Sequence, residues 1–413
     1  MSGIPVSAGP LSRLPVAYRI RRAVRADRSS IVRLSVQAHG TIDGAGAGVI
    51  FDRGDPADWT VVEDADGAIV STCALLSHRL RLGCVVLPVG RLEYVATAPP
   101  HRRNGLIRSQ FRIHHRASAR RGDLATFVSG IPYFYRRFGY GYAMDYPSLH
   151  SLDAVLAATG SPRSAWSVRE LRRPDLDVVR RLHESATANA DIAEVRDDRT
   201  WEDQVHGETP YAQTFLVAER AGRIGGYARL AATDDSEFVL AQATALDADC
   251  FGAILAHAEA VSGSQEVLVA GSPCPVVGPI LARLPQAHLH LPLYGRIADP
   301  LRLLERLRPE LDRRLQHARS APPDDGLDIS LYATGLRLHF AGRRIEAIEA
   351  TSANEYPAPQ EVAISPDNLP ALVFGRFDPT ELARRVDDVQ LGRHADLMGI
   401  LFPRLCNAVF GDL

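Results

Sequence analysis

A group of arginines in the stretch 94–121, YVATAPPHRRNGLIRSQFRIHHRASARR, suggests chemistry because the stretch contains no acidic residue. Arg102, Arg103 and Arg108 supply full positive charges there. A strand that stops at the Pro-Pro pair and a helix that begins near Gly105 leave backbone N–H groups unpaired at the helix N-terminus, where the helix dipole adds positive potential. Such a corner binds phosphate, so we expect a pyrophosphate group as its ligand.

This anion corner also needs a backbone that a ligand can approach. Asn104 and Gly105 permit that approach, because they leave the backbone accessible. A solvated basic turn on the surface is the alternative interpretation. The residues expected to contact the anion are Arg102, Arg103, Asn104, Gly105, Leu106, Ile107 and Arg108.

The elements that position the corner follow from apolar periodicity and turn signals. The sequence predicts the order β, α, β, β, β before the basic helix, with Asp27 capping the first helix and a hairpin turn at 64–67. The glycine-rich stretch from His39 to Gly48 is predicted to be a mobile loop. The other predicted segments are strands at 17–22, 59–63, 68–80, 94–97, 124–128 and 140–149, a helix at 27–37 and a helical turn at 132–137.

A second unit is predicted to repeat this pattern without the charges of the corner. The matched segments are 60–70 with 215–225, 95–98 with 242–245, and Gly105 with Gly252. At the turn, Asp249 and Cys250 take the places of two arginines and Leu255 takes the place of the third, so this second corner would repel a pyrophosphate. The second copy is therefore predicted to be a scaffold, and chance similarity between short apolar strands is the alternative.

A third unit follows a predicted helix at 300–317 and a linker at 318–326. Alternating apolar residues predict a hairpin within 336–350. The final stretch, PRLCNAVFGDL, is largely apolar and is expected to pack against the protein. Further helices are predicted at 368–374, 379–386 and 395–402.

Length and composition agree with three globular domains, since the chain has 413 residues of which 46% are hydrophobic. A net charge of −2 argues against a general nucleic-acid binder, and no run approaches membrane-spanning length. The five cysteines form no metal-ligand or disulfide pattern, and the adjacent His114 and His115 point to different helix faces, so we expect no metal site and a cytoplasmic protein.

The corner approximates the pattern R-x-x-G-x-G/A, with Ile107 where a small residue usually lies. Together with the strand before it and the helix after it, this pattern resembles the acetyl-CoA-binding motif of the GNAT N-acetyltransferase superfamily. The segment IPYFYRRFGYGYA at 131–143 looks like the Eis (enhanced intracellular survival) branch of that superfamily. The resemblance implies an α/β (α+β) fold with three domains, and possible hexamers. The implied domains are an active GNAT domain at 1–156, a degenerate GNAT-like domain at 157–299 and a sterol-carrier-like domain at 300–413.

The resemblance assigns roles to individual residues. Tyr135 corresponds to the family's proton donor, and an ordinary tyrosine pKa of about 10 lets it protonate a departing thiolate whose conjugate acid has a pKa of about 8.5. A purely structural tyrosine is the alternative. The cofactor groove is implied to contain Val95, Ala96, Thr97, Ser129 and Gly130 in addition to the anion corner.

The family's general base is the C-terminal carboxylate, which here belongs to Leu413. An α-carboxyl group has a pKa of about 3.5, so desolvation or a water relay would have to assist it. Asp412 matches an acidic residue of related enzymes and could attract a cationic amine. An ordinary packed terminus is the alternative.

The sequence therefore predicts an acetyl-CoA-dependent N-acetyltransferase that transfers the acetyl group directly to an amine. Family analogy suggests a polyamine-like acceptor such as an aminoglycoside, or lysine side chains. The alternatives are an enzyme for a natural-product amine or a longer acyl-CoA, a non-catalytic acyl-CoA-binding regulator, and a lipid-binding protein that uses the third unit. A homo-oligomer is expected, with no nucleic acid and no membrane as partners.

Overall fold

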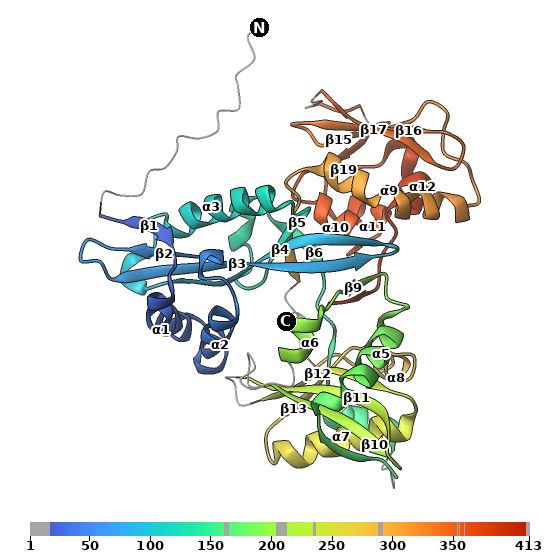
Figure 1. Cartoon of the computed structure of the whole chain (residues 1–413). Coiled ribbons are helices and arrows are strands. Elements are labelled where there is room, and N and C mark those ends of the chain that lie inside the picture. The colour runs from blue at the N-terminus through green and yellow to red at the C-terminus, as the bar shows by residue number, and fades with distance from the viewer. Residues whose placement is uncertain are drawn as a thin grey trace. The chain divides into compact units, whose positions relative to one another are not determined.

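The structure is a computed structural model of the whole chain (Figure 1). It describes residues 17–160, 165–203, 213–233, 237–287, 292–352, 354, 356–358 and 360–409. The chain divides into two compact units, of which the first comprises residues 1–76 and 92–121 and the second comprises residues 77–91 and 122–413.

The first unit is an antiparallel sheet in the order β1-β2-β3-β4 with helices on both faces. Figure 1 shows α3 on one side of this sheet and α1 and α2 on the other. Its strands are β1 (Arg19–Arg22), β2 (Trp59–Glu63), β3 (Ile69–Leu82) and β4 (Val85–Thr97), and its helices are α1 (Arg28–His39), α2 (Thr41–Arg53) and α3 (Leu106–Arg121). The strands predicted at 17–22, 59–63 and 68–80, the hairpin turn and the basic helix are confirmed within a few residues. The strand predicted at 94–97 is the end of the longer strand β4, and β3 and β4 continue into the second unit.

The prediction of a mobile loop from His39 to Gly48 is wrong, because this stretch forms most of α2. A Cβ atom at Gly44 would lie 2.3 Å from the Cα atom of Val36 in α1, so glycine lets the two helix backbones touch. Phe51 at the end of α2 is fully buried against Trp59, with ring centroids 5.5 Å apart. The glycines of α2 therefore serve close helix packing, which outweighs their low helix propensity.

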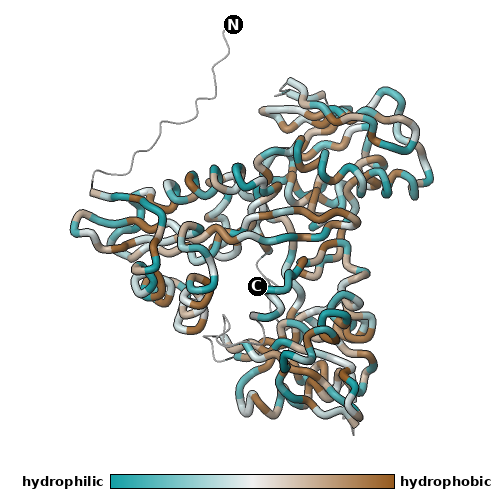
Figure 2. The backbone as a smooth tube through the Cα atoms, in the orientation of Figure 1, coloured by the Kyte–Doolittle hydropathy of each residue, from teal (hydrophilic) through white to brown (hydrophobic). Residues whose placement is uncertain are grey.

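The second unit contains the remaining ends of β3 and β4 and two further sheets. Figure 2 shows hydrophobic stretches, in brown, along the β3–β4 hairpin. Next to β4 the strand order is β4-β5-β14-β6, and β9 pairs with the end of β3 while β20 pairs with β9. These strands are β5 (Ala125–Val128), β6 (Gly141–Met144), β9 (Ile192–Glu194), β14 (Leu293–Arg296) and β20 (Asn407–Ala408).

The single strand predicted at 140–149 is two strands that belong to different sheets. β6 pairs with β14, whereas β7 (Leu149–Ser151) pairs with β13 in the second sheet. That sheet has the order β7-β13-β12-β11-β10-β8. Its other strands are β8 (Ser167–Glu170), β10 (Gln213–Arg220), β11 (Arg223–Ala232), β12 (Phe238–Ala245) and β13 (Val267–Ala270), and its helices are α4 (Leu152–Thr159), α5 (Leu176–Thr187), α6 (Asp198–Asp203), α7 (Ala248–Ser262) and α8 (Val277–Leu281).

A triad of one arginine and two carboxylates occurs in the first sheet and again in the second sheet, which is the predicted repeat. Arg21 binds Asp27 at 2.6 Å and Glu63 at 2.7 Å, and the amide of Val24 donates to the Asp27 carboxylate at 2.8 Å. Asp27 occupies the N-cap position of α1, as predicted, but its side chain makes no capping hydrogen bond to the helix. The carboxylate bonds an amide on its N-terminal side instead of an amide of the helix.

The second triad has the same geometry. Arg169 binds Asp175 at 2.7 Å and Glu219 at 2.8 Å, and the amide of Arg172 donates to Asp175 at 2.8 Å. The strand that bears the glutamate has a register shift at the same place in both segments, directly before the glutamate. The triads support the interpretation of an internal repeat and shift the sequence alignment by one residue, so that Glu63 matches Glu219.

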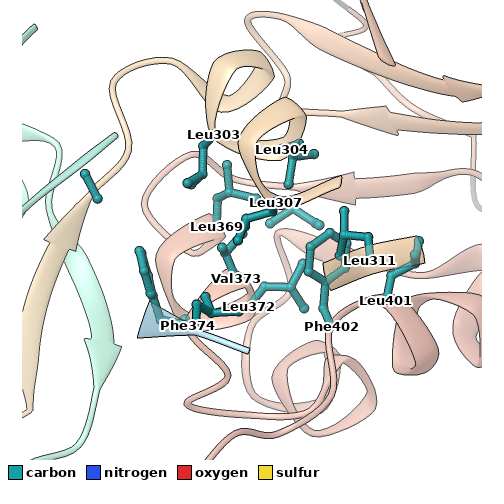
Figure 3. Close-up of a cluster of buried hydrophobic side chains, with 14 of the residues drawn as sticks. Leu303, Leu304, Leu307, Leu311, Leu369, Leu372, Val373, Phe374, Leu401 and Phe402 are labelled. Atoms are coloured by element: carbon teal, nitrogen blue, oxygen red, sulfur yellow. The ribbon is translucent and has the colours of Figure 1, made fainter. Parts of the chain in front are cut away.

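The third sheet has the order β17-β16-β15-β18-β19, and α9 and α11 contact it at β17 and β19. The predicted hairpin is confirmed, since β16 pairs with β17. Leucine and phenylalanine side chains of α9, α10 and α12 form a continuous buried cluster (Figure 3). The elements are α9 (Pro300–His317), β15 (Leu327–Ser330), β16 (Gly335–Phe340), β17 (Ile345–Thr351), β18 (Val362–Ile364), α10 (Leu369–Val373), α11 (Pro379–Arg385), β19 (Val389–Gln390) and α12 (Ala395–Leu401).

Candidate active site

The anion corner lies in the first unit, between the end of β4 and the start of α3. Arg103 and Gly105 have positive φ angles of 67° and 73°, and a Cβ atom at Gly105 would meet no atom within 4 Å. The amide of Ser109 donates to the Gly105 carbonyl at 3.1 Å, which closes the first turn of α3. The amides of Leu106 and Ile107 precede this bond, so they point out of the helix end as an anion-binding group of N–H donors.

The side chains of the corner divide into two groups. Arg102, Arg103 and Arg108 are exposed, and Arg102 donates through Nε to the Thr97 carbonyl at 3.2 Å. The side chain of Leu106 is buried, so this residue offers a ligand only its backbone. The exposed guanidinium groups supply the long-range attraction, and the N–H groups supply the directional bonds.

The side chain of Asn104 supports the turn itself. Its Nδ2 group lies 3.2 Å from the Tyr18 hydroxyl and 3.2 Å from the His101 carbonyl oxygen. The Tyr18 hydroxyl lies 3.1 Å from Nδ1 of His101, which completes a small polar cluster. Asn104 therefore fixes the shape of the corner.

The end of β4 presents alternate residues to its two edges. The Ala98 amide donates to the Val70 carbonyl of β3 at 2.9 Å, and the Ala96 carbonyl accepts from the Ser71 hydroxyl at 2.8 Å. Because strand residues alternate, Val95 and Thr97 direct their amide and carbonyl groups to the opposite edge. Tyr94 has a φ angle of 51°, which is uncommon for a non-glycine residue.

The corresponding connection in the second sheet is much shorter. Residues 98–105 separate β4 from α3, whereas only residues 246 and 247 separate β12 from α7. The matches of Asp249 and Cys250 with the arginines, and of Gly252 with Gly105, are therefore wrong, because all three residues lie inside α7. The carboxylate of Asp247 accepts from the Cys250 amide at 2.7 Å and so occupies the helix N-terminus that the first unit leaves accessible.

Tyr135 lies in the second unit, in a 3-10 turn at Phe134–Phe138, and only 5% of its surface is exposed. Gly130 has a φ angle of 121°, and a Cβ atom at this position would lie 3.2 Å from the Tyr135 hydroxyl. Gly130 therefore touches the hydroxyl of the predicted proton donor, and a larger residue would displace it. Ser129 precedes Gly130 and is half-buried.

Tyr294 holds the turn that carries Tyr135. The Tyr133 amide donates to the Tyr294 hydroxyl at 2.6 Å, and that hydroxyl donates to Tyr142 at 2.9 Å. The rings of Tyr135 and Tyr294 lie 5.4 Å apart, edge to face. Burial, together with the bond to Tyr142, raises the pKa of Tyr294 to about 12, so its proton stays in place at neutral pH.

The C-terminal segment packs as predicted as far as it is described. β20 pairs with β9, the Cys406 amide donates to Asp191 at 2.8 Å, and Val409 is buried. Asp412 and Leu413 lie outside the described residues, so their roles stay predictions.

The described residues contain no group of three or more His, Cys, Asp or Glu placed to hold a metal ion. All five cysteines are described, and each is a free thiol. Among the described helices, none combines the length and the apolar character that crossing a membrane requires.

The residues around this site match a known protein family. Residues 19–143 match the family described as acetyltransferase (GNAT) domain. The N-acetyltransferase Eis of Mycobacterium tuberculosis is 39% identical over 104 residues, a match that covers 24% of this chain and only 25% of the relative. The Eis protein of Mycobacterium bovis matches to the same extent.

Solved structures resemble the chain over nearly its whole length. A GCN5-related N-acetyltransferase from Anabaena variabilis has a TM-score of 0.65 at 12% identity, covering 93% of this chain and 97% of that one. Eis1 from Mycobacterium abscessus has a TM-score of 0.59 at 14% identity, covering 96% and 100%. At these identities the likeness concerns the fold, which is a GNAT acetyltransferase fold with several mixed α/β sheets.

The comparisons confirm the resemblance to the Eis-like branch of the GNAT superfamily, and they support an acyltransferase. The matched residues 19–143 include the anion corner, the end of β4, Ser129, Gly130 and Tyr135. Tyr294 lies outside them, and nothing in the sequence around it signalled a role beside Tyr135.

Proposed function

We propose that this protein is an acetyl-CoA-dependent N-acetyltransferase that acetylates the amine of a small polyamine-like acceptor, such as an aminoglycoside, or of lysine side chains. The observation that carries the proposal is the anion corner, where outward amides and exposed arginines meet at the start of α3 within the residues that match the GNAT family. A pyrophosphate fits this combination of helix end and positive charge. Coenzyme A contains such a group.

In the proposed reaction, the acceptor nitrogen attacks the thioester carbonyl, a C–N bond forms and the C–S bond breaks. The outward amides of Val95 and Thr97 bind the acetyl-pantetheine part and polarise the carbonyl. The thiolate that leaves takes a proton from Tyr135, whose hydroxyl is held against Gly130. The acceptor nitrogen loses its proton to a base.

For the base we retain the α-carboxylate of Leu413, with Asp412 attracting the cationic acceptor. The support is the anchoring of β20 and the burial of Val409, which give the last residues a fixed starting point within the second unit. A variant with a few residues added after Leu413 should lose turnover while it keeps acetyl-CoA affinity. Full activity in that variant would remove Leu413 from the mechanism.

We also propose three domains at 1–156, 157–299 and 300–413, the second a degenerate GNAT-like copy and the third sterol-carrier-like. The duplicated ion-pair triad and the common element order support the tandem arrangement. The blocked start of α7 supports the loss of cofactor binding in the second copy. The cytoplasmic location and the homo-oligomer remain predictions.

The decisive experiment measures thiol release from acetyl-CoA with a panel of polyamines, aminoglycosides and lysine peptides, beside calorimetric binding of coenzyme A. We expect turnover with at least one amine, and about 100- to 10,000-fold slower turnover in Tyr135→Phe. Tyr140→Phe is the matched control, because it removes a buried hydroxyl of the same aromatic cluster that bonds Thr126 at 3.2 Å. Coenzyme A binding without turnover of any amine would favour a regulator, and no binding would reject the proposal.

A further inference from the structure

We infer that Ser71 and Gln110 are positioning residues that hold the end of β4 in register with α3 and thereby set the affinity for acetyl-CoA. The inference rests on the proposed function, since it deepens the role of the anion corner and of Val95 and Thr97. Neither residue is in the corner, and both are completely buried in the first unit.

Ser71 joins β3 to the end of β4. Its hydroxyl donates to the Ala96 carbonyl at 2.8 Å, and it lies 2.8 Å from the Thr97 hydroxyl. Because the Ala96 carbonyl can only accept, the Ser71 proton points to Ala96 and the Thr97 hydroxyl donates to Ser71. The Ala96 carbonyl and the Thr97 side chain are thus both held by Ser71 of β3, beside the backbone groups of Val95 and Thr97 that point to the opposite edge of β4.

Gln110 links Ser71 to α3. Its Nε2 group donates to the Ser71 hydroxyl at 2.8 Å, and its Oε1 atom accepts from the Thr60 hydroxyl at 2.9 Å. Gln110 lies one turn beyond the first residue of α3, Leu106. The network therefore connects the two elements that the proposed ligand would touch, the start of α3 and the end of β4.

His114 closes the network and fixes its direction. Its Nε2 atom lies 3.1 Å from the Cys73 carbonyl and 2.9 Å from the Thr60 hydroxyl, so this nitrogen carries the proton and Thr60 donates onward to Gln110. The other ring nitrogen is buried without a hydrogen-bond partner among the described residues. Burial lowers the pKa of His114 to about 3, so the ring stays neutral and the network keeps one direction at neutral pH.

The second sheet provides an internal comparison. The Leu246 amide donates to the Gly225 carbonyl as the Ala98 amide donates to Val70, which matches Gly226 with Ser71. The predicted match of 95–98 with 242–245 is therefore wrong by one residue, and Ala245 matches Thr97. Counted from the first residue of each helix, Gly252 in α7 takes the place that Gln110 has in α3. The segment without an accessible corner therefore has glycine and alanine where the first unit has its buried hydroxyl and amide groups.

The two sheets differ in how the strand end is joined to the helix at these matched positions. In the second sheet Cys250 and Ile254 pack against Gly226, where a Cβ atom would lie 2.7 Å from the Cys250 sulfur. That sheet has a buried polar network at a different place, where the His183 side chain of α5 lies 2.9 Å from the Tyr227 hydroxyl and 2.9 Å from Nε2 of Gln242. The network of Ser71 and Gln110 instead lies between the strand end and the helix end that the proposed ligand would touch.

The test uses the full chain and coenzyme A as the probe. Ser71→Ala and Gln110→Met should each weaken calorimetric binding of coenzyme A about fivefold, the effect of one net hydrogen bond, and should raise KM for acetyl-CoA by a similar factor. We expect kcat to change less than twofold, because neither side chain contacts the reacting atoms in the proposed mechanism.

Ile31→Val is the matched control, since it perturbs the buried core of the same unit without touching the network. It should lower stability to urea while leaving both coenzyme A affinity and KM unchanged. Affinities of Ser71→Ala and Gln110→Met that equal that of Ile31→Val would overturn the inference. A wild-type protein that does not bind coenzyme A would instead reject the proposed function.

Discussion

Replacing Gly130 with alanine tests whether the Tyr135 hydroxyl acts in the reaction. The added Cβ atom would lie 3.2 Å from that hydroxyl, so Tyr135 must move by a few tenths of an ångström. The φ angle of 121° adds backbone strain, which costs about 1–3 kcal/mol of folding stability. The substitution therefore has a stability effect and a positional effect that can be measured separately.

The positional effect can be estimated from the sensitivity of catalysis to geometry. A displacement of about 1 Å costs roughly 100-fold in rate, so a shift of a few tenths of an ångström corresponds to roughly threefold to tenfold. We expect Gly130→Ala to lower kcat by this factor in the thiol-release assay at saturating acetyl-CoA. Its free energy of unfolding, measured in urea, should fall by about 1–3 kcal/mol.

Gly160→Ala is the control for backbone strain alone. Gly160 follows α4 with a φ angle of 75° and a ψ angle of 166°, and a Cβ atom there would meet nothing within 4 Å. This variant should lose stability but keep its kcat. Equal kcat values for Gly130→Ala and Gly160→Ala would show that the contact with Tyr135 has no catalytic consequence.

A double-mutant cycle with Tyr135→Phe completes the test. Once the hydroxyl is absent, Gly130→Ala has nothing to displace, so it should cost less than twofold in kcat in that background. If the alanine slows the Tyr135→Phe protein as much as it slows the wild type, the two residues act independently and the reasoning is refuted.

Other perturbations address the corner, the triads and the core. Arg103→Ala should raise KM for acetyl-CoA roughly tenfold through the loss of a charge-assisted contact. Arg120→Ala, at the far end of α3, should change this KM less than twofold. Equal KM values for the two variants would contradict the proposed corner. The bonds from arginine hold the pKa of Asp27 below its ordinary value, so this stabilisation is complete above the unfolded pKa of about 3.9 and is lost as pH falls through the folded pKa. Asp27→Asn should therefore lower the free energy of unfolding by about 2 kcal/mol at pH 7, and by progressively less below pH 4, in urea titrations. Asp175→Asn should behave in the same way. A loss of unfolding free energy that stays the same in acid would exclude the ion pairs as its cause. Leu372→Ala should lower the free energy of unfolding by about 2–5 kcal/mol because Leu372 is completely buried, and a loss below 1 kcal/mol would indicate that the cluster of Figure 3 collapses around the cavity.

Elements with local signals were predictable from the sequence. The strand Trp59–Glu63 ends in an Asp-rich turn with Gly67, whose φ angle of 80° requires the glycine. The helix that follows the corner was predictable because the Pro-Pro pair and Gly105 mark its start. Such features depend on neighbours within a few residues, which a sequence displays directly.

Features that depend on distant partners were not predictable. α2 was missed because the reason for its glycines is the backbone of α1 across the helix pair, which no composition rule reveals. The separation of β6 from β7 was missed although Pro147 lies between them, because the two strands pair with partners that are distant in the sequence and belong to different sheets. Strand β14 joins β5 and β6 from a position far along the chain, so Tyr294 could not be associated with Tyr135.

The candidate site shows the same division. The arginines and Tyr135 were identified because their spacing resembles a known motif, and each acts through what it presents to a ligand. Ser71 and Gln110 have no motif, and their importance follows from hydrogen bonds to residues that lie 25 and 39 positions away. Supporting residues of this kind become visible only when the strands and helix are placed.

The two related segments share some features, which the fold requires, and differ in others, which ligand binding requires. The triad of Arg21 and its partners recurs as that of Arg169, so this ion-pair geometry belongs to the fold. Of the two related segments, as far as they are described, only the first has the long connection with its arginines and the network of Ser71 and Gln110 behind it, and the second has Gly226 in place of Ser71. Since apolar packing fills the matched positions of the second copy, the joint presence of corner and network in the first is best explained by one common requirement, the proposed binding of a single extended ligand along the end of β4 and the start of α3.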